Sequence, residues 1–237
     1  MLKKPKNRLP IANGLLTALT RAEYQRVLVN LIPVELHIDE VLYEPGETIK
    51  HVYFPTDALV SKQTLVDQHH SLEVAMIGRE GMVGAMIALG VKLSPFRAVV
   101  QGGGSALRMN ATVFRKEFRQ NLSMQREVHL YTRELLSQIA QTAACNRFHS
   151  VEERLARRLL MTRDRMGSDY FSLTHEFLGN MLSVRRVGVT KAAYQLKQRQ
   201  LIDYTRGNIA ILDARGLAAS ACSCYESANA KDIHGKA

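Results

Sequence analysis

The chain has 237 residues, of which 46% are hydrophobic and 23% are charged. This composition is typical of a globular protein with a sizeable core, and it excludes wholesale disorder, a fibrous repeat and a peptide-sized scaffold. Lys and Arg total 32 against 22 Asp and Glu, so the net charge is +10 at pH 7. Such an imbalance favours a polyanionic partner, either nucleic acid or an acidic membrane surface.

Three features indicate the compartment. The chain has three cysteines, a small and odd number that does not make a disulfide framework and that fits a reducing environment. Residues 1–10 are basic like the start of an export signal, but Pro10, Asn13 and Gly14 interrupt the apolar stretch that such a signal needs. No run reaches the roughly 18 apolar residues that a membrane span needs. We therefore expect a cytoplasmic protein with no membrane partner.

The first half of the chain changes its periodicity once. Between Ile11 and Leu31, apolar residues recur every three or four positions, which predicts a short helical lead-in. From Leu36 to Met109 the period falls to two, and β-branched clusters at 49–54 and 72–77 are separated by turns that contain glycine. Short strands spaced by glycine turns predict an antiparallel β-roll.

A long helix is predicted next, because residues 110–166 contain neither proline nor glycine. Its apolar stripe is narrow and flanked by charges, so we expect the stripe to meet another helix, most simply that of a second copy. The alternative is a helix that packs only on its own domain. The stripe consists of Val128, Tyr131, Leu135, Ile139, Thr142 and Asn146.

A further helix is predicted from Val151 to Met166, and the sequence 167–169 ends it. Its leucines and Met161 form the inner face. We expect its arginines to lie largely outside, namely Arg154, Arg157, Arg158, Arg163 and Arg165.

The stretch from Leu173 to Ile211 predicts two helices and a hairpin. Thr174 is placed to cap a short helix over 175–182, and a second helix follows over about 185–198. A hairpin then spans 201–212 with its turn at 205–207. Helix, tight break and helix make a helix-turn-helix, and the hairpin makes its wing.

The second helix of this unit has a basic outer face that suits the major groove of DNA. Six Lys or Arg against one Asp lie between Ser183 and Gly207. Arg185, Arg199 and Arg206 are expected to contact phosphate, and Arg186 and Lys191 to contact bases. The full set of DNA-binding candidates is Thr174, Arg185, Arg186, Val187, Thr190, Lys191, Arg199 and Arg206.

The order of these segments resembles the Crp–Fnr superfamily of bacterial transcription regulators over essentially the whole chain. The similarity is carried by residues 173–179 and 185–190, and by Gly46 with Glu47 in the roll. It implies an α+β fold: a cyclic-nucleotide-binding-type β-roll over 1–120, a dimerisation helix over 121–149 and a winged helix-turn-helix over 150–237. It also implies a homodimer on an inverted-repeat operator, base-reading positions at Arg186, Val187 and Lys191, and RNA polymerase as a partner.

The chain departs from the family pattern at two positions of the helix-turn-helix. Val187 replaces the glutamate of well-known members, and valine offers only apolar contact, for instance to a thymine methyl group. Ser183 stands where glycine is frequent, which costs about 1 kcal/mol if its φ is positive. We therefore expect a different target sequence.

Small-molecule binding by the roll is the least supported expectation. The region that matches the family's nucleotide site contains Gly84, Ala85, Phe96 and Arg97, so the ribose-binding carboxylate is replaced by alanine and the arginine is displaced by one position. We therefore doubt that cyclic AMP binds, and leave open either another effector or an empty roll.

No cofactor and no metal are expected. An iron–sulfur cluster of the Fnr type needs N-terminal cysteines, and the first cysteine here is Cys145, which we interpret as a small buried residue. Cys222 and Cys224 could pair, or bind a metal with His234, but two close thiols are a weak metal signal, so we interpret them as incidental.

No catalytic motif is present, so we expect no enzyme. His175-Glu176 lacks the second histidine of a zinc protease, and Gly102–Gly104 lacks the Lys of a phosphate loop. The alternative to a DNA-binding regulator is a ligand-sensing roll whose C-terminal helices bind a protein or RNA partner. Against this alternative, the basic face has few aromatic side chains for base stacking.

Overall fold

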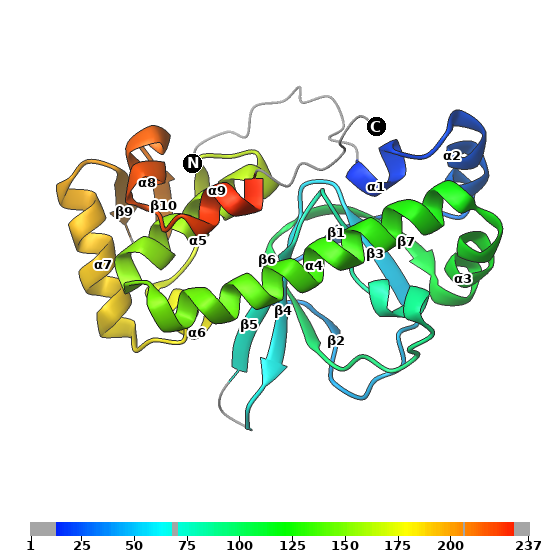
Figure 1. Cartoon of the computed structure of the whole chain (residues 1–237), viewed down its shortest axis with the longest axis horizontal. Coiled ribbons are helices and arrows are strands. Elements are labelled where there is room, and N and C mark those ends of the chain that lie inside the picture. Colours follow the sequence, from blue (N-terminus) through cyan, green and yellow to red (C-terminus); the bar gives the residue numbers. More distant parts are fainter. Residues whose placement is uncertain (1–12, 68–70, 206, 230–237) are drawn as a thin grey trace.

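A computed structural model describes residues 13–67, 71–205 and 207–229 (Figure 1). The N-terminal basic segment 1–10, Arg206 and His234 lie outside the described residues. The expected fold class is confirmed: an antiparallel roll, a long helix and a helix-turn-helix with a wing follow one another along the chain. No helix within the described ranges combines the length and apolar character that crossing a bilayer requires.

The N-terminal part is a roll of two antiparallel sheets that share one core, preceded by α1 (Gly14–Thr17) and α2 (Arg21–Leu28). The sheet orders are β1-β7-β3 and β2-β6-β4-β5. Period-two burial along the strands produces this arrangement, because alternate side chains face the interior. The strands are β1 (Ile32–Leu36), β2 (Val41–Tyr43), β3 (His51–Pro55), β4 (Leu59–Leu65), β5 (Ser71–Ile77), β6 (Arg97–Gly102) and β7 (Gly104–Asn110), with a 3-10 helix η1 at Ala85–Leu89.

The helical segment after the roll is divided in three, of which the second and third helices were predicted and the first was not. α3 (Ala111–Gln120) ends at Asn121, whose side chain caps α4 (Leu122–Phe148). α4 runs across the molecule, with the roll along its first half and the C-terminal helices at its far end (Figure 1). α5 (Val151–Met166) then begins at a Ser150–Glu153 capping box and ends at Gly167, which has a φ of 61°.

The expected seam of α4 is wrong for its first residues. Val128, Tyr131 and Leu135 are buried in the core of the chain's own roll. The Tyr131 ring lies against Gly81, where a Cβ would be 2.1 Å from the ring, and its hydroxyl donates to the carbonyl of Met82 at 3.1 Å. The stripe is apolar because it covers the roll, so packing on its own domain accounts for these residues.

The expectation that the arginines of α5 lie outside is wrong for three of the five. Arg154, Arg157 and Arg158 are only 8%, 7% and 6% exposed. α5 is covered on several sides, because it contacts β4 of the roll, the helices of the C-terminal unit and the C-terminal segment. Long side chains that would reach water on a surface helix are therefore enclosed, and their guanidinium groups need internal partners.

Arg158 has such a partner in the roll. Its guanidinium forms a buried ion pair with Glu73 of β5 and also donates to the side-chain oxygen of Gln101 at 2.5 Å. Ser61 completes the group by donating to Glu73 at 2.6 Å. This pair joins the C-terminal unit to the roll through charges that are removed from solvent.

The C-terminal unit has its own core, built from α5, α6 (His175–Leu182), α7 (Arg186–Gln198) and a small sheet. The sheet order is β8-β10-β9, with β8 (Tyr170–Ser172), β9 (Ile202–Thr205) and β10 (Asn208–Ile211). The hairpin of β9 and β10 is the predicted wing, whereas β8 was not predicted. The chain continues into α8 (Ala214–Ser220) and α9 (Cys224–Asn229), and α9 contacts both α4 and α5.

Candidate nucleic-acid interface

α6 begins as its sequence predicts. The Thr174 hydroxyl accepts from the backbone N–H of Phe177 at 3.1 Å, which satisfies one of the free amides of the first turn. Leu178 and Leu182 are buried on the inner face of the helix. Thr174 itself is exposed, so the capped end of α6 lies at the surface, and the apolar side of the helix packs on the core of the C-terminal unit.

The turn between α6 and α7 is tight, and two residues carry its geometry. Ser183 has a φ of 52° and a ψ of 46°, so the backbone at this position is left-handed and the condition for a cost of replacing glycine is met. A Cβ on Gly179 would lie 2.9 Å from the carbonyl oxygen of Val184, so only glycine allows this approach without a shift. The close contact allows α6 and α7 to pack against each other directly across the turn, as the helices of a helix-turn-helix do.

α7 divides its side chains into a buried and an exposed face. Val189, Ala192, Ala193 and Leu196 are buried in the core of the unit. The exposed face carries the predicted candidates Arg185, Arg186, Val187, Thr190 and Lys191, and Val187 is 72% exposed. Among the described residues, the side chains of Arg185, Arg186 and Lys191 form no ion pair and no hydrogen bond with a protein group. The face therefore presents cationic groups that the described part of the chain does not neutralise.

Two basic residues at the far end of α7 are engaged differently. Arg199 pairs with Glu152 of α5 at 2.9 Å and donates to the Ser220 hydroxyl at 2.7 Å. Lys197 pairs with Asp203 of the wing at 2.6 Å. The structure thus separates Arg199 from the other candidates and gives it an internal partner. A phosphate contact by Arg199 stays a prediction.

His175 contacts a residue of the exposed face of α7 and the wing, a role that sequence reasoning missed. Its Nδ1 lies 3.0 Å from the Thr190 hydroxyl, and its ring stacks on Tyr204 of β9 with centroids 3.9 Å apart. Burial, with a smaller contribution from the cation of Arg186, lowers the pKa of His175 below its ordinary value. His175 therefore joins α6, α7 and the wing. The only advance signal was its place after the N-cap, which does not show what it touches.

The wing is fastened next to the start of α6. The carbonyl oxygen of Gly207 accepts from the backbone N–H of Leu173 at 2.7 Å, and Gly207 has a φ of 83° that the turn requires. Arg206, the predicted phosphate contact at the tip, lies outside the described residues.

The residues that match the family's nucleotide site are occupied by internal contacts. Gly84 precedes η1 with a φ of 93°, and a Cβ there would be 3.0 Å from the Tyr43 hydroxyl. Ala85 is buried, and Arg97 pairs with Glu44 at 3.0 Å. The ring of Phe96 lies beneath the ammonium of Lys62, at 4.2 Å from its centroid, and burial lowers the pKa of Lys62 to about 8.

The sequence interpretation treated Cys145 apart from Cys222 and Cys224, but in the structure the three cysteines lie together. Cys145 at the end of α4 lies beside Cys222 and Cys224, which precede and begin α9. A separation of 77 residues between Cys145 and Cys222 left no local pattern that would reveal this contact.

Comparisons with known proteins agree with this architecture. The family model of the Crp-like helix-turn-helix domain matches residues 153–220. FixK2 from Bradyrhizobium japonicum superposes with a TM-score of 0.70 at 16% identity, over 81% of this chain and 98% of its own. The regulator CLP from Xanthomonas campestris, described as c-di-GMP-responsive, has a TM-score of 0.65 at 13% identity, over 81% and 99%.

A third solved structure is TTHB099, a Crp-family transcriptional regulator from Thermus thermophilus, with a TM-score of 0.65 at 19% identity, over 79% of this chain and 97% of its own. No curated protein sequence matches the chain. The chain carries a Crp-like helix-turn-helix domain and has the fold of Crp/Fnr-type transcription regulators.

Proposed function

We propose that the chain is a sequence-specific transcription regulator that binds duplex DNA as a homodimer on an inverted-repeat operator. The observation that carries this proposal is the exposed basic face of α7 within a Crp-like helix-turn-helix, where Arg185, Arg186 and Lys191 have no ion-pair partner among the described residues. A phosphate backbone supplies the missing counter-charges, and the groove receives a helix whose N-terminal residues face outward.

The individual residues take different roles in this proposal. Arg185 contacts phosphate, while Arg186 and Lys191 add contacts to base edges. Val187 and Thr190 lie between them on the exposed face and contribute apolar and hydroxyl contacts, with Thr190 held by His175. Thr174, at the exposed start of α6, and the wing meet the flanking backbone.

A second copy is proposed along the side of α4 that faces away from the roll. The exposed positions there are spaced by three and four residues, which is the heptad spacing of a helix that meets a partner helix. Leu136 is 64% exposed, and Ala140 and Ala143 continue the same line with small side chains. The full line is Leu122, Arg126, His129, Arg133, Leu136, Ala140, Ala143 and Arg147.

Dimerisation through this line is tested by Leu136→Glu with Ala140→Glu, measured by analytical ultracentrifugation. Buried glutamates opposite their own copies should convert the dimer to a monomer. Lys116→Glu on the exposed surface of α3 is the matched control and should leave the dimer intact. A wild-type chain that sediments as a monomer contradicts the proposal.

The roll is proposed not to use cyclic AMP as its effector. Ala85 lacks a carboxylate for the ribose, and the Arg97 guanidinium is paired with Glu44. Regulation then acts through another effector or through none, with RNA polymerase as the partner at the promoter.

The decisive experiment is selection of binding sites by the full chain from a random duplex library, with and without cyclic AMP. We expect an inverted repeat whose half-sites lie about one helical turn apart, roughly 34 Å, and no change on adding the nucleotide. Affinity that falls steeply with salt accompanies this result. Preference for unpaired RNA, or no discrimination among duplexes, would instead support the protein- or RNA-binding alternative.

A further inference from the structure

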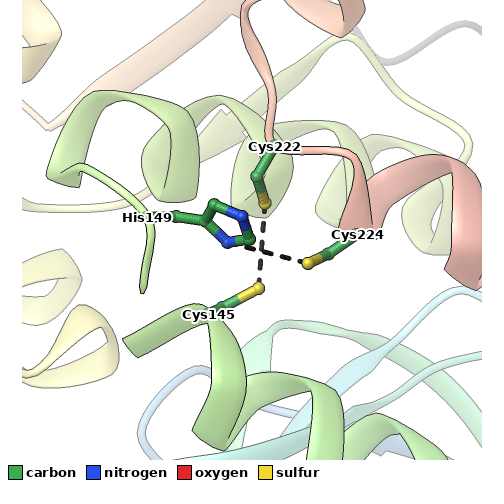
Figure 2. Close-up of side chains that lie close together, drawn as sticks. All are labelled: Cys145, His149, Cys222 and Cys224. Atoms are coloured by element: carbon green, nitrogen blue, oxygen red, sulfur yellow. Dashed lines mark hydrogen bonds between the residues drawn. The ribbon is translucent and has the colours of Figure 1, made fainter. Parts of the chain in front are cut away.

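Four side chains with metal-binding atoms converge where α4 ends (Figure 2). Cys145 lies in the last turn of α4, and His149 is the residue that follows the helix. Cys222 lies in the segment between α8 and α9, and Cys224 is the first residue of α9. We call these four residues the thiol cluster. Their ligand atoms all lie within 4.8 Å of one another, and the three cysteines are buried.

The spacing within the thiol cluster fits one tetrahedral metal ion. The Sγ atoms of Cys145 and Cys222 are 3.7 Å apart, and the Sγ of Cys224 is 3.7 Å from Nδ1 of His149. Zinc binds thiolate sulfur at about 2.3 Å and imidazole nitrogen at about 2.0–2.1 Å, so around a tetrahedral zinc ion two sulfur atoms lie about 3.8 Å apart and a sulfur and a nitrogen about 3.6 Å. Figure 2 shows these two pairs crossing each other, as opposite edges of a tetrahedron do.

The backbone holds the ligands in place without the metal. Cys145 and His149 are one helical turn apart, and the backbone N–H of His149 donates to the carbonyl of Cys145 at 3.1 Å. His149 then leaves the helix in an extended conformation, with a φ of −114° and a ψ of 148°. The Cys-Ser-Cys segment supplies the other two ligands, with Ser223 exposed between them.

The groups around the thiol cluster are hydrogen-bond donors that suit thiolates. The Gln141 side chain donates to Cys224 Sγ at 2.8 Å, and the Arg157 guanidinium donates to Cys145 Sγ at 3.5 Å. Nε and Nη2 of Arg157 are buried without a hydrogen-bond partner, and within the described ranges Arg157 pairs with no carboxylate. A zinc ion with three thiolates carries one net negative charge, which would offset this enclosed cation.

We propose that Cys145, His149, Cys222 and Cys224 bind a zinc ion. The ion replaces the three thiol protons, takes neutral His149 through Nδ1, and leaves the chain's redox state unchanged. It fastens the C-terminal segment to the end of α4, where the chain passes into α5 of the C-terminal unit. This inference does not depend on DNA binding, because the metal content of the free protein tests it.

The first measurement is the zinc content of the full chain, produced without a metal-affinity tag and dialysed in the presence of a reductant. We expect about one zinc ion per chain by elemental mass spectrometry. Replacement by Co²⁺ should produce the intense visible absorption and sulfur-to-metal charge-transfer bands of a tetrahedral site with thiolate ligands. Protein with no zinc, three titratable thiols and no Co²⁺ spectrum overturns the proposal.

Variants then test the ligand set. Cys222→Ser, Cys224→Ser and His149→Asn should each lose the ion or weaken its binding, while Ser223→Ala and His37→Asn retain it as matched controls. His234→Asn should also retain the ion. Retention by His149→Asn together with loss in His234→Asn would overturn the assignment of His149.

Gln141→Leu keeps the ligand set and removes only a donor to Cys224, so it serves where a cysteine variant fails to fold. Loss of such a positioning residue should weaken zinc affinity about 10- to 100-fold, measured by competition with a chromophoric chelator. Unchanged affinity would contradict thiolate coordination by Cys224. In the wild type, removal of zinc should increase amide exchange in 221–229 before it affects the roll.

The oxidation state of the thiols gives a last test. A disulfide between Cys145 and Cys222 in wild-type protein that is isolated without bound zinc also overturns the proposal.

Discussion

Three basic residues of α5 and the roll differ from three basic residues on the exposed face of α7 in where their counter-charges lie. Arg158 pairs with Glu73, Arg165 with Glu80 and Arg97 with Glu44, so these charges are compensated inside the chain. Arg185, Arg186 and Lys191 on the exposed face of α7 have no such partner among the described residues. Internal pairs fix how the parts of one molecule fit together, whereas exposed charges without an internal partner are accessible to a second molecule.

The largest effect is expected from breaking the buried pair. Glu73→Ala leaves Arg158 charged, enclosed and without its carboxylate, and should lower the free energy of unfolding by about 3–5 kcal/mol. Urea unfolding measures the change. The double variant Glu73→Leu with Arg158→Met removes both charges and should recover most of the loss. A single variant that loses less than about 1 kcal/mol would show that the pair is solvated, like a surface pair.

Arg186→Ala tests whether the exposed basic residues of α7 bind DNA. Binding to the selected operator should weaken by about 1–3 kcal/mol, with the loss concentrated at one base position, because a bidentate contact to guanine discriminates among bases. Binding assays on operators with single substitutions measure this. Arg185→Ala is the matched variant and should weaken all sequences alike while reducing the salt slope by about one. Uniform weakening by Arg186→Ala would assign it to phosphate.

His175, which contacts Thr190 on the α7 face, should make the free energy of unfolding depend on pH. The folded pKa of His175 lies below its unfolded value of about 6.5, because burial and Arg186 oppose the charged ring. The unfolded chain therefore binds the proton more readily, and this contribution to stability is present above pH 6.5 and lost as the pH falls below it. The slope is at most about 1.4 kcal/mol per pH unit.

Unfolding at several pH values measures this dependence. His175→Phe preserves the stacking on Tyr204 without a titratable group and should flatten the acid side of the profile. His37→Asn, at an exposed position, should leave the profile as in the wild type. An identical slope in His175→Phe would assign the acid sensitivity to another group.

The smallest effect concerns the exposed pair of the roll. Arg97→Ala, Glu44→Ala and the double variant form a cycle whose coupling free energy should be about 0.2–1 kcal/mol, because both side chains remain partly in water. Thermal or urea unfolding measures it. A nucleotide that bound Arg97 would have to displace Glu44. Glu44→Ala removes this competitor, so calorimetry of this variant with cyclic AMP tests whether Arg97 can bind the nucleotide. No heat of binding is expected.

Much of the architecture was predictable because local patterns produce it. The Thr174 cap, the helix boundaries near 182 and 185, and the hairpin around Gly207 all depend on a few adjacent residues. β8 was missed because three residues are too short for a period-two signal, and its place in the sheet depends on β10, which lies far along the chain.

Sequence alone determined which residues share a face of a helix or strand, because that depends only on the repeat of the backbone. Which of those faces is covered was decided by the tertiary structure. Arg154, Arg157 and Arg158 form a basic face on α5 that folding encloses, and the apolar stripe of α4 covers the chain's own roll. The thiol cluster unites residues from two ends of the C-terminal half. Burial depends on segments that are distant in the chain, and a local repeat does not specify which segment packs against a given face.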